Sequence, residues 1–276
     1  MDTQNNNIFE FKERISQSEF ERVRSMIYSY CGIHINTRKQ VLVQSRLSKR
    51  MRQLGISTFN EYLDLVNSEK PRGEFLSFVD VLTTNKTSFY RENRHFEFIK
   101  NVLYPEMKGR SVKWWSAGCS SGEEPITLAM NLLEAQHQFG WPNVKILATD
   151  ISREVLSIAK SGIYPSHKIS DIPPQYLRKY FTQLPDNIYQ VNANVKNLIT
   201  FGRLNLKNHW PLKGDFQMIM CRNVMIYFNR KTQGQIVHKF RELLELGGYL
   251  FLGHSESMNA ARLGFKNIAP AVYQKT

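Results

Sequence analysis

The chain is poor in cysteine and lacks the patterns that direct a protein out of the cytoplasm. Its 276 residues include only Cys31, Cys119 and Cys221, which form no C-x-x-C pair. A set this small and scattered builds no disulfide framework, so a reducing compartment fits best. The opening MDTQNNN is not the basic-then-apolar start of a signal peptide. No apolar run approaches the roughly 20 residues of a membrane-spanning helix. We therefore expect a cytoplasmic protein with no direct membrane insertion.

Two further absences concern metals and acidic residues. The 7 histidines show no ligand spacing, so we expect no metal site. No acid lies between Glu21 and Glu61, in a chain whose formal charge is +13. The interval instead holds a block of basic residues: Arg22, Arg24, Arg38, Lys39, Arg46, Lys49, Arg50 and Arg52. Such a block predicts an acidic partner, whether nucleic acid, anionic lipid or protein, although a solvated helix face explains it equally well.

The N-terminal part of the chain predicts short helices and no strand. Apolar residues recur there at helical spacing, and one helix is expected over residues 36–55. On that helix Arg46, Lys49 and Arg50 are spaced i, i+3 and i+4, so they lie close together on its surface. We expect a small helical domain over residues 1–85.

From residue 110 onward, strand-like and helix-like segments alternate. The apolar runs VKWWS, VKILATD, DFQMIMC and GYLFLG look like buried strands separated by helical stretches. This alternation predicts an α/β domain with a doubly wound, mainly parallel sheet over residues 86–276. The interval 163–204 interrupts it with prolines and the strand-like runs NIYQVN and NLITFGRL. We interpret that interval as an inserted β subdomain with an antiparallel hairpin, whose short turn lies near residues 184–187.

A loop of small residues follows the first predicted strand. The stretch WWSAGCSSGEEP (114–125) contains glycines, which let a ligand approach the backbone closely, and ends on a pair of acids at the expected start of a helix. Acids there oppose a phosphate ligand, although they also simply offset the helix dipole. Asp150 ends the second strand, where an acid either binds a ribose diol or stabilises a turn. A diol combined with a positively charged sulfonium favours S-adenosylmethionine over NAD.

Several motifs resemble the CheR family, the bacterial chemotaxis receptor methyltransferases. They are TTNKTSFYRE (83–92), WSAGCSSGEEP (115–125), ATD (148–150), LNL (204–206), CRNVMIYF (221–228) and GHSES (253–257). The combination is far more specific than a glycine loop alone, and the resemblance extends over nearly the whole chain. It implies a Rossmann-like S-adenosylmethionine-dependent methyltransferase domain, preceded by a helical domain and carrying an inserted antiparallel β subdomain.

The resemblance also implies roles for individual residues. It assigns cofactor binding to Asn85, Thr87, Arg91, Glu124, Asp150, Asn205, Leu206, Arg222 and Asn223. In this set Asp150 holds the ribose, and Asn205 with Leu206 borders the adenine. Arg91 and Tyr227 are the expected catalytic residues, because both can donate hydrogen bonds to an incoming carboxylate. From the sequence alone, Tyr227 reads more simply as a packed core aromatic.

The family's reaction esterifies glutamate side chains in the cytoplasmic helical region of a chemoreceptor and leaves S-adenosylhomocysteine. A glutamate with a pKa of about 4.3 is already ionised at neutral pH, so no general base is required. The enzyme must align the reactants and remove water from a weak nucleophile. Arg46, Lys49 and Arg50 would bind the acidic receptor surface. The short turn at 184–187 makes docking on a receptor C-terminal tail peptide doubtful.

Two other functions fit parts of the sequence. An RNA methyltransferase would share the fold and explain the charge, but CRNV stands where base-amino methyltransferases usually carry D/N-P-P-aromatic. A non-catalytic cofactor-binding scaffold in a chemosensory array is less consistent with the presence of Arg91 and Tyr227. We therefore expect a protein-glutamate methyltransferase and no nucleic-acid partner.

Overall fold

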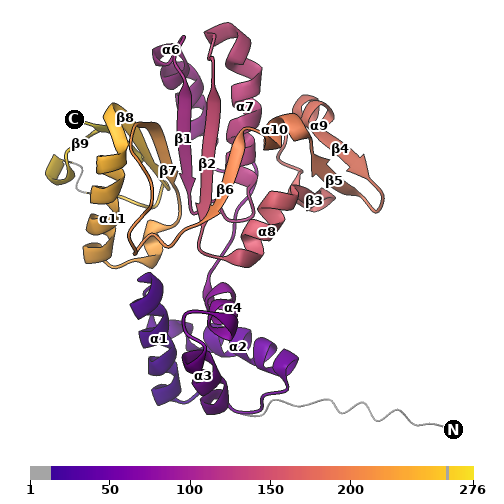
Figure 1. Cartoon of the computed structure of the whole chain (residues 1–276), viewed down its shortest axis with the longest axis vertical. Helices are drawn as coiled ribbons and strands as arrows, with labels where there is room; N and C mark the ends of the chain where they lie inside the picture. The colour runs from indigo at the N-terminus through magenta and orange to yellow at the C-terminus, as the bar shows by residue number, and fades with distance from the viewer. Residues whose placement is uncertain (1–13, 259–260) are drawn as a thin grey trace. The chain divides into compact units, whose positions relative to one another are not determined.

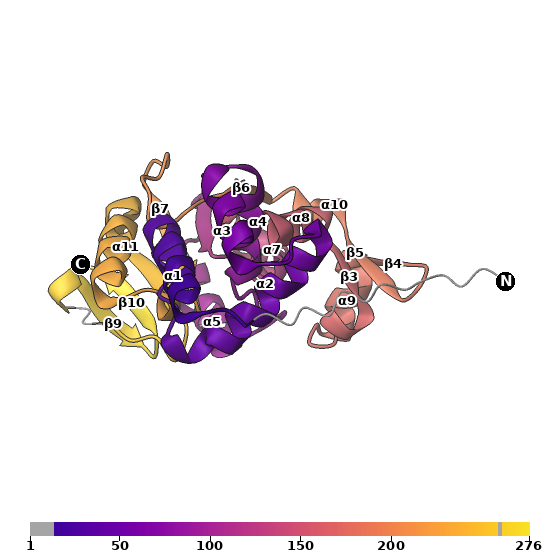
Figure 2. The same cartoon turned by 90° about the horizontal axis from the view of Figure 1, so that it is seen from below.

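A computed structural model describes residues 14–258 and 261–276 of the chain (Figures 1 and 2). The chain divides into two compact units, one ending at Thr84 and the other beginning at Asn85. We call them the helical unit and the sheet unit. Among the described residues, no helix is both long and apolar enough to cross a lipid bilayer.

The described part of the helical unit is built mainly from α-helices. They are α1 (Gln17–Cys31), α2 (Gln40–Leu54), α3 (Phe59–Ser68) and α4 (Gly73–Leu82). The helix expected over 36–55 is found as a 3-10 turn, Thr37–Lys39, that leads directly into α2. Apolar side chains from all four helices are fully buried, among them Phe20, Leu47, Leu63 and Phe78. The helical periodicity of the sequence therefore identifies the core faces correctly.

The sheet unit is centred on a mixed sheet with the strand order β6-β2-β1-β7-β8-β10-β9 (Figure 1). Neighbouring strands from β6 to β8 run parallel, and β10 and β9 add an antiparallel edge. The strands are β1 (Val112–Ala117), β2 (Val144–Asp150), β6 (Ile199–Arg203), β7 (Phe216–Cys221), β8 (Leu244–Leu252), β9 (Phe265–Ala269) and β10 (Val272–Lys275). The predicted doubly wound α/β architecture is thus confirmed.

Helices cover both faces of this sheet, as the contacts of its central strand show. They include α5 (Arg94–Phe98), the π-helix η2 (Ile99–Leu103), α6 (Tyr104–Glu106), α7 (Glu123–Phe139), α8 (Arg153–Ser161) and α11 (Arg230–Leu243). Successive side chains of a strand point to opposite faces. On β1, Trp114 therefore stacks on Tyr104 of α6, while Trp115 packs edge-on against Phe240 of α11. Both tryptophans are fully buried, so apolar side chains of this strand are covered on both faces of the sheet.

The inserted subdomain is a small antiparallel sheet with the order β3-β5-β4. Its elements are β3 (Ile163–Pro165), η3 (Ser166–Lys168), α9 (Pro174–Tyr180), β4 (Phe181–Leu184), β5 (Ile188–Val191) and α10 (Ala193–Lys196). The predicted antiparallel character is confirmed. The hairpin turn between β4 and β5 is short, and Asp186 and Asn187 both have left-handed φ angles, of 60° and 53°. Asn and Asp tolerate this conformation better than other non-glycine residues, and tight hairpins often need it.

One strand expected in the inserted subdomain belongs to the main sheet. The run NLITFGRL contains β6, which pairs in parallel with β2 over the whole length from Ile146 to Asp150. The placement of this run in the 163–204 insertion is therefore wrong. An edge strand of a parallel sheet and a hairpin strand both bury alternate residues, so their sequence patterns do not distinguish the partner.

The carboxyl ends of the parallel strands meet along one edge of the sheet. Chain order reverses at β1, which has β2 on one side and β7 on the other. In open α/β sheets this switch point is where ligands bind, outside the carboxyl ends of the strands. The loops that follow β1, β2, β6, β7 and β8 therefore define the place to look for a site.

Candidate active site

The loop after β1 is tied to β2 by its backbone. The amides of Gly118 and Cys119 both donate to the carbonyl of Thr149, at 2.7 and 2.9 Å. Gly118 and Gly122 have left-handed φ angles of 84° and 95°. A Cβ at Gly118 would lie 2.4 Å from the Val224 side chain, so only glycine fits there. The loop is thus a close-packed backbone turn at the switch point, as a ligand-binding loop requires.

Asp150 fastens this loop to the end of β2. One carboxylate oxygen accepts the amide of Ser120 at 2.8 Å, and the other accepts the amide of Ser152 at 3.0 Å. Ser152 caps α8, as expected, by accepting the amide of Val155. A carboxylate offers about four lone-pair positions, so it can accept several hydrogen bonds at once. Ser120 in turn donates its hydroxyl to the carbonyl of Asn85, at 3.0 Å.

Glu124 forms a buried ion pair that the sequence did not suggest. Its two carboxylate oxygens accept from Arg222 Nε at 2.8 Å and from the Ser116 hydroxyl at 2.7 Å. Glu124 is 8% exposed and Arg222 is 7% exposed. The carboxylate therefore already has a positive partner. Its pull on a sulfonium is weaker than the isolated acid pair in the sequence implies, because the ion pair as a whole is neutral.

Arg222 connects the loop after β7 to segment 85–92. Its Nη1 donates to the carbonyl of Arg91 at 2.6 Å and lies 3.7 Å from the carboxylate of Glu92. The same nitrogen lies 3.3 Å from His95 Nδ1. The fork geometry of a guanidinium suits this arrangement, because one side chain can bond several acceptors at once. Arg222 and Glu124 together fix the positions of three segments relative to one another: the start of α7, the turn after β7 and segment 85–92.

Arg91 lies on an unusual piece of backbone. Its neighbours Tyr90 and Glu92 both have left-handed φ angles, of 54° and 55°, which are rare for large side chains. Arg91 itself is half-buried and donates from Nη1 to the carbonyl of Lys86 at 2.7 Å. Strained backbone persists only where surrounding contacts enforce it, and it gathers at functional sites. The bond from Arg222 to the Arg91 carbonyl is one such contact.

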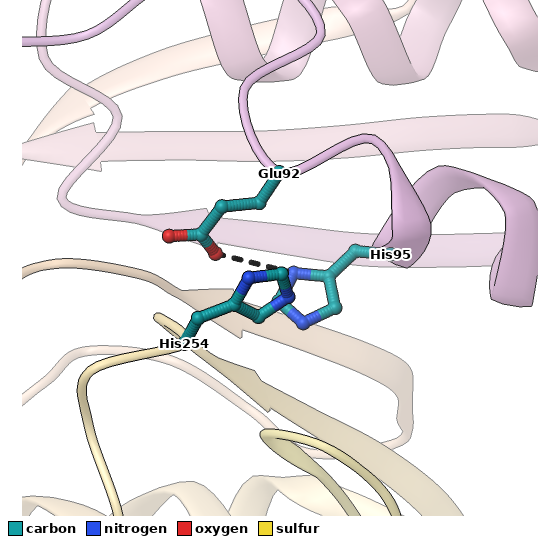
Figure 3. Close-up of side chains that lie close together, drawn as sticks. All are labelled: Glu92, His95 and His254. Carbon is teal, nitrogen blue, oxygen red and sulfur yellow. Dashed lines mark ion pairs between the residues drawn. The ribbon is translucent and has the colours of Figure 1, made fainter.

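A cluster formed by Glu92, His95 and His254 lies beside Arg222 (Figure 3). The rings of His95 and His254 meet edge-to-face with centroids 4.6 Å apart. Burial lowers the pKa of His95 to about 4, and the charge of Arg222 acts in the same direction. His95 is therefore neutral at neutral pH. We assign no metal to this cluster, because the Arg222 guanidinium already places a positive charge against its Glu92 and His95 acceptors.

The remaining predicted residues line neighbouring loops. Asn205 and Leu206 follow β6, whose ladder with β2 continues through the bond from the Leu204 amide to the Asp150 carbonyl, at 2.9 Å. Leu206 is 8% exposed and belongs to the core on the Trp115 face of the sheet. Thr87 is half-buried in segment 85–92, so it shares that segment with Asn85 and Arg91.

Asn223 and Tyr227 lie in the turn after β7. Asn223 has a left-handed φ of 58° and donates its side-chain amide to Glu92 at 3.3 Å. Tyr227 is half-buried and ends the 3-10 turn η4 (Met225–Tyr227). Direct hydrogen bonds thus join segment 85–92, the loop after β1, Asp150 and the turn after β7.

The basic residues expected to bind the receptor belong to the helical unit, and their contacts differ. Arg46 donates from Nη1 to the carbonyls that end α4, at 2.9–3.3 Å. Arg50 forms a two-pronged pair with Glu74, at 2.9 and 2.6 Å. Lys49 is exposed. Arg46 and Arg50 therefore serve the fold of the helical unit, and Lys49 presents its charge to solvent.

The two cysteines near the site act as buried apolar groups. Cys119 is 1% exposed and Cys221 is fully buried. Burial raises the pKa of both thiols well above the ordinary value, and nearby carboxylates add to the effect. Neither is a thiolate nucleophile at neutral pH.

Sequence reasoning missed several residues that organise the site. They are Ser116, Glu92, His95 and Glu256, each hydrogen-bonded to a residue of the site. Glu92 and Glu256 stand inside motifs that the sequence singles out, without a role assigned to them. The available signal was a polar residue just beyond the carboxyl end of a strand, as with Glu256 after β8. Nothing in the sequence specified its partners.

The chain matches two families of known domains. The CheR methyltransferase all-alpha domain matches residues 18–83, and the CheR methyltransferase SAM binding domain matches residues 85–273. These two matches correspond to the two compact units described above.

Relatives of similar length resemble the chain almost from end to end. The chemotaxis protein methyltransferase of Borreliella burgdorferi is 38% identical over 98% of this chain and 99% of its own length. A probable chemotaxis protein methyltransferase of Rhizobium etli is 41% identical over 91% of this chain and 97% of its own length. The chemotaxis protein methyltransferase of Escherichia coli is 36% identical over 94% of this chain and 91% of its own length. The chain therefore belongs to the CheR methyltransferase family, whose larger domain binds S-adenosylmethionine.

Proposed function

We propose that this protein transfers the methyl group of S-adenosylmethionine to glutamate side chains of chemoreceptors, forming glutamate methyl esters and S-adenosylhomocysteine. Membership of the family supports the reaction. One observation carries the assignment to this site: Arg91 stands on strained backbone whose carbonyl is held by the Arg222–Glu124 ion pair. That arrangement keeps a permanently charged guanidinium beside the switch point of the sheet, where the cofactor is expected.

The residues around the switch point fit a nucleoside cofactor. The loop after β1 packs so closely against neighbouring residues that a Cβ at Gly118 or Gly122 would collide with them. Asp150 ends β2, the position at which an acid binds a ribose diol in dinucleotide folds, and Asn205 and Leu206 follow the next strand, where adenine would lie. The remaining proposed cofactor contacts come from Asn85, Thr87, Arg91, Glu124, Arg222 and Asn223. When bound, S-adenosylmethionine supplies an activated methyl group and a neutral leaving group.

In this proposal the protein orients reactants and moves no proton. The substrate carboxylate is ionised at neutral pH, since an ordinary glutamate has a pKa of about 4.3. Arg91 and Tyr227 donate hydrogen bonds that aim one carboxylate oxygen at the methyl carbon. Arg91 has five N–H donors, so its bond to Lys86 leaves others for the substrate. The carboxylate must keep its nucleophilicity, so we expect alignment rather than tight neutralisation.

We further propose that the helical domain, residues 1–85, recognises the acidic cytoplasmic helices of the receptor, while residues 86–276 carry out transfer. Of the three basic residues predicted to bind receptor, Lys49 is the best placed to steer, because Arg46 and Arg50 have partners within the unit. We expect no docking of a receptor C-terminal tail peptide on the inserted subdomain, because the β4–β5 turn is short. Calorimetry with an isolated receptor tail peptide tests that point, and a clear heat of binding would contradict it. A cytoplasmic location belongs to the same proposal.

The reaction is tested with methyl-labelled S-adenosylmethionine and receptor. A carboxyl methyl ester releases labelled methanol in alkali, whereas methylated RNA or an inert binder does not. We expect Arg91→Ala to lower this release by about 100-fold or more, because alignment of the carboxylate is lost. Arg94→Ala is the matched control, since Arg94 is an exposed arginine three positions further along. Near-normal release by Arg91→Ala would remove Arg91 from the mechanism.

A further inference from the structure

Glu256, in the loop after β8, has a buried carboxylate with an unusual set of partners. It accepts three backbone amides: Gly253 at 2.7 Å, Asn223 at 2.8 Å and Ile226 at 3.0 Å. The residue is 6% exposed. Hydrogen bonds from backbone amides to an ionised carboxylate are stronger than neutral ones. A buried charge with such partners is held firmly in one place.

These bonds fasten the loop after β8 to the turn after β7. The two backbones approach so closely that a Cβ at Gly253 would lie 2.9 Å from the amide nitrogen of Asn223. Asn223 is in the left-handed region, with a φ of 58°, a conformation that Asn tolerates well. The Glu256 carboxylate accepts the amides of Asn223 and Ile226, so it holds the backbone on both sides of Val224.

The supported turn carries the groups that face the reaction. Arg222 precedes Asn223, and Tyr227 directly follows Ile226 in η4. The second carboxylate oxygen binds the Ile226 amide inside that 3-10 turn. Fixing the amides at 223 and 226 therefore fixes the direction in which the next residue, Tyr227, leaves the backbone.

We propose that Glu256 is a positioning residue for methyl transfer, which acts by holding the 223–227 turn so that Tyr227 meets the receptor carboxylate. The inference rests on the proposed function. Glu256 does not touch substrate or cofactor in this account. Its effect passes through Tyr227, and so it belongs to the transfer step more than to cofactor binding.

The charge and length of the side chain both matter. Glu256→Gln keeps the size but replaces one acceptor oxygen with an NH2 group. That group would face a backbone N–H, so two donors would meet and a hydrogen bond would be lost. Glu256→Asp keeps the charge but cannot reach all three amides at once. Glu245→Gln is the matched control, because Glu245 lies at the start of β8 and pairs with Arg110 away from the site.

The experiment is a double-mutant cycle on kcat, measured with saturating receptor and S-adenosylmethionine. Wild type, Glu256→Gln, Tyr227→Phe and the double variant are compared, and calorimetry gives the Kd of S-adenosylhomocysteine for each. We expect Glu256→Gln to lower kcat by about 10- to 100-fold, with a smaller fold-change in Kd, because Asn223 on the same turn is a proposed cofactor contact. In the Tyr227→Phe background the same substitution should cost little more, because the group it positions is already gone. Glu256→Asp should fall between Glu256→Gln and wild type.

Several results would overturn the proposal. One is an unchanged kcat in Glu256→Gln, and another is an unchanged kcat in Tyr227→Phe. A third is full multiplication of the two effects in the double variant, which is the mark of a merely structural role. If Glu256→Gln does not fold, the cycle is run with Glu256→Asp and judged by the same criteria. A wild-type protein that transfers no methyl group refutes the proposed function itself, whereas an active wild type with multiplying effects refutes only the role of Glu256.

Discussion

Arg222 of the sheet unit and Arg50 of the helical unit both pair with a buried acid, but they differ in exposure and in number of partners. In the sheet unit, the Arg222 side chain is 2% exposed, and its partners come from α7, segment 85–92 and α5. In the helical unit, the Arg50 side chain is 27% exposed and meets one buried acid, Glu74. A buried guanidinium with several partners orders a site, whereas a half-exposed pair mostly stabilises its own helices. Arg222 thus joins loops of the candidate site, whereas Arg50 stabilises the packing of the helical unit.

The strongest test of this contrast is removal of Arg222. Arg222→Ala leaves Glu124 as a buried carboxylate with no cationic partner, which typically destabilises a protein by about 3–5 kcal/mol. We expect a loss of this size in the free energy of unfolding, measured with urea, together with loss of measurable cofactor affinity. Arg110→Ala, at an exposed pair with Glu245, is the control and should change stability by less than about 1 kcal/mol. If both substitutions lowered the free energy of unfolding equally, burial of Arg222 would have no special effect on stability.

The second test uses pH and His95. Burial lowers the pKa of His95 to about 4 in the folded protein, against an ordinary value of 6.5. As the pH falls, the unfolded chain therefore protonates at His95 before the folded protein does. The contribution of neutral His95 to the free energy of unfolding is complete above pH 6.5 and is lost as the pH falls toward 4. The loss amounts to about 3 kcal/mol over that range, at 1.36 kcal/mol per pH unit.

The measurement is the free energy of unfolding at pH 7 and pH 4.5, for wild type and for His95→Gln. The difference between the two proteins isolates His95 from other acid-titrating groups. His137→Gln, at an exposed histidine, is the control and should follow the wild type. A His95→Gln variant as acid-sensitive as wild type would contradict a neutral, buried His95 beside Arg222.

The third test concerns the helical unit. Glu74 accepts from Arg50 and from the buried hydroxyl of Tyr62, at 2.9 Å. Glu74→Gln weakens both interactions, and we expect it to lower the unfolding free energy by about 1–3 kcal/mol. Cofactor affinity measured by calorimetry should not change, since the effect stays within the helical unit. A matching loss of cofactor affinity would show that this acid has a role beyond its own helices.

The smallest expected effect belongs to Lys49. Lys49→Glu should lower kcat/KM for receptor severalfold at low ionic strength, and the effect should shrink as salt screens the charge. Lys266→Glu changes the net charge equally at an exposed position on β9 and serves as the control. Equal losses in the two variants would indicate only a general effect of net charge. Unchanged kinetics in Lys49→Glu would leave α2 as an ordinary solvated helix face.

The sequence predicts the fold well because the fold follows from local patterns. The run around Trp114 and Trp115 places large apolar side chains on successive positions, which point to opposite faces, so it indicates a strand buried on both faces. The run that forms β6 lies in the main sheet and not in the predicted insertion, since alternation of apolar residues says nothing about which strand lies beside it. Pairing is a long-range property, and a single sequence contains no direct signal for it.

The candidate site shows the same limit more sharply. Asp150 and the loop glycines are recognisable, because each has a local reason to follow a strand. The pairing of Glu124 with Arg222 joins residues almost a hundred positions apart. The three backbone amides that donate to Glu256 are equally unpredictable from the sequence, since every residue except proline has a backbone N–H. What the sequence cannot specify is thus the set of contacts that hold the recognisable residues in place.

In the proposed function, a receptor glutamate becomes a methyl ester at this site. Mass spectrometry of receptor peptides after incubation with the protein and S-adenosylmethionine tests it most directly. We predict the added mass of one methyl group on glutamates of the cytoplasmic helical region, removed by mild alkali and absent with Arg91→Ala. Modification of another residue type, an alkali-stable product, or unchanged labelling by Arg91→Ala would contradict this function.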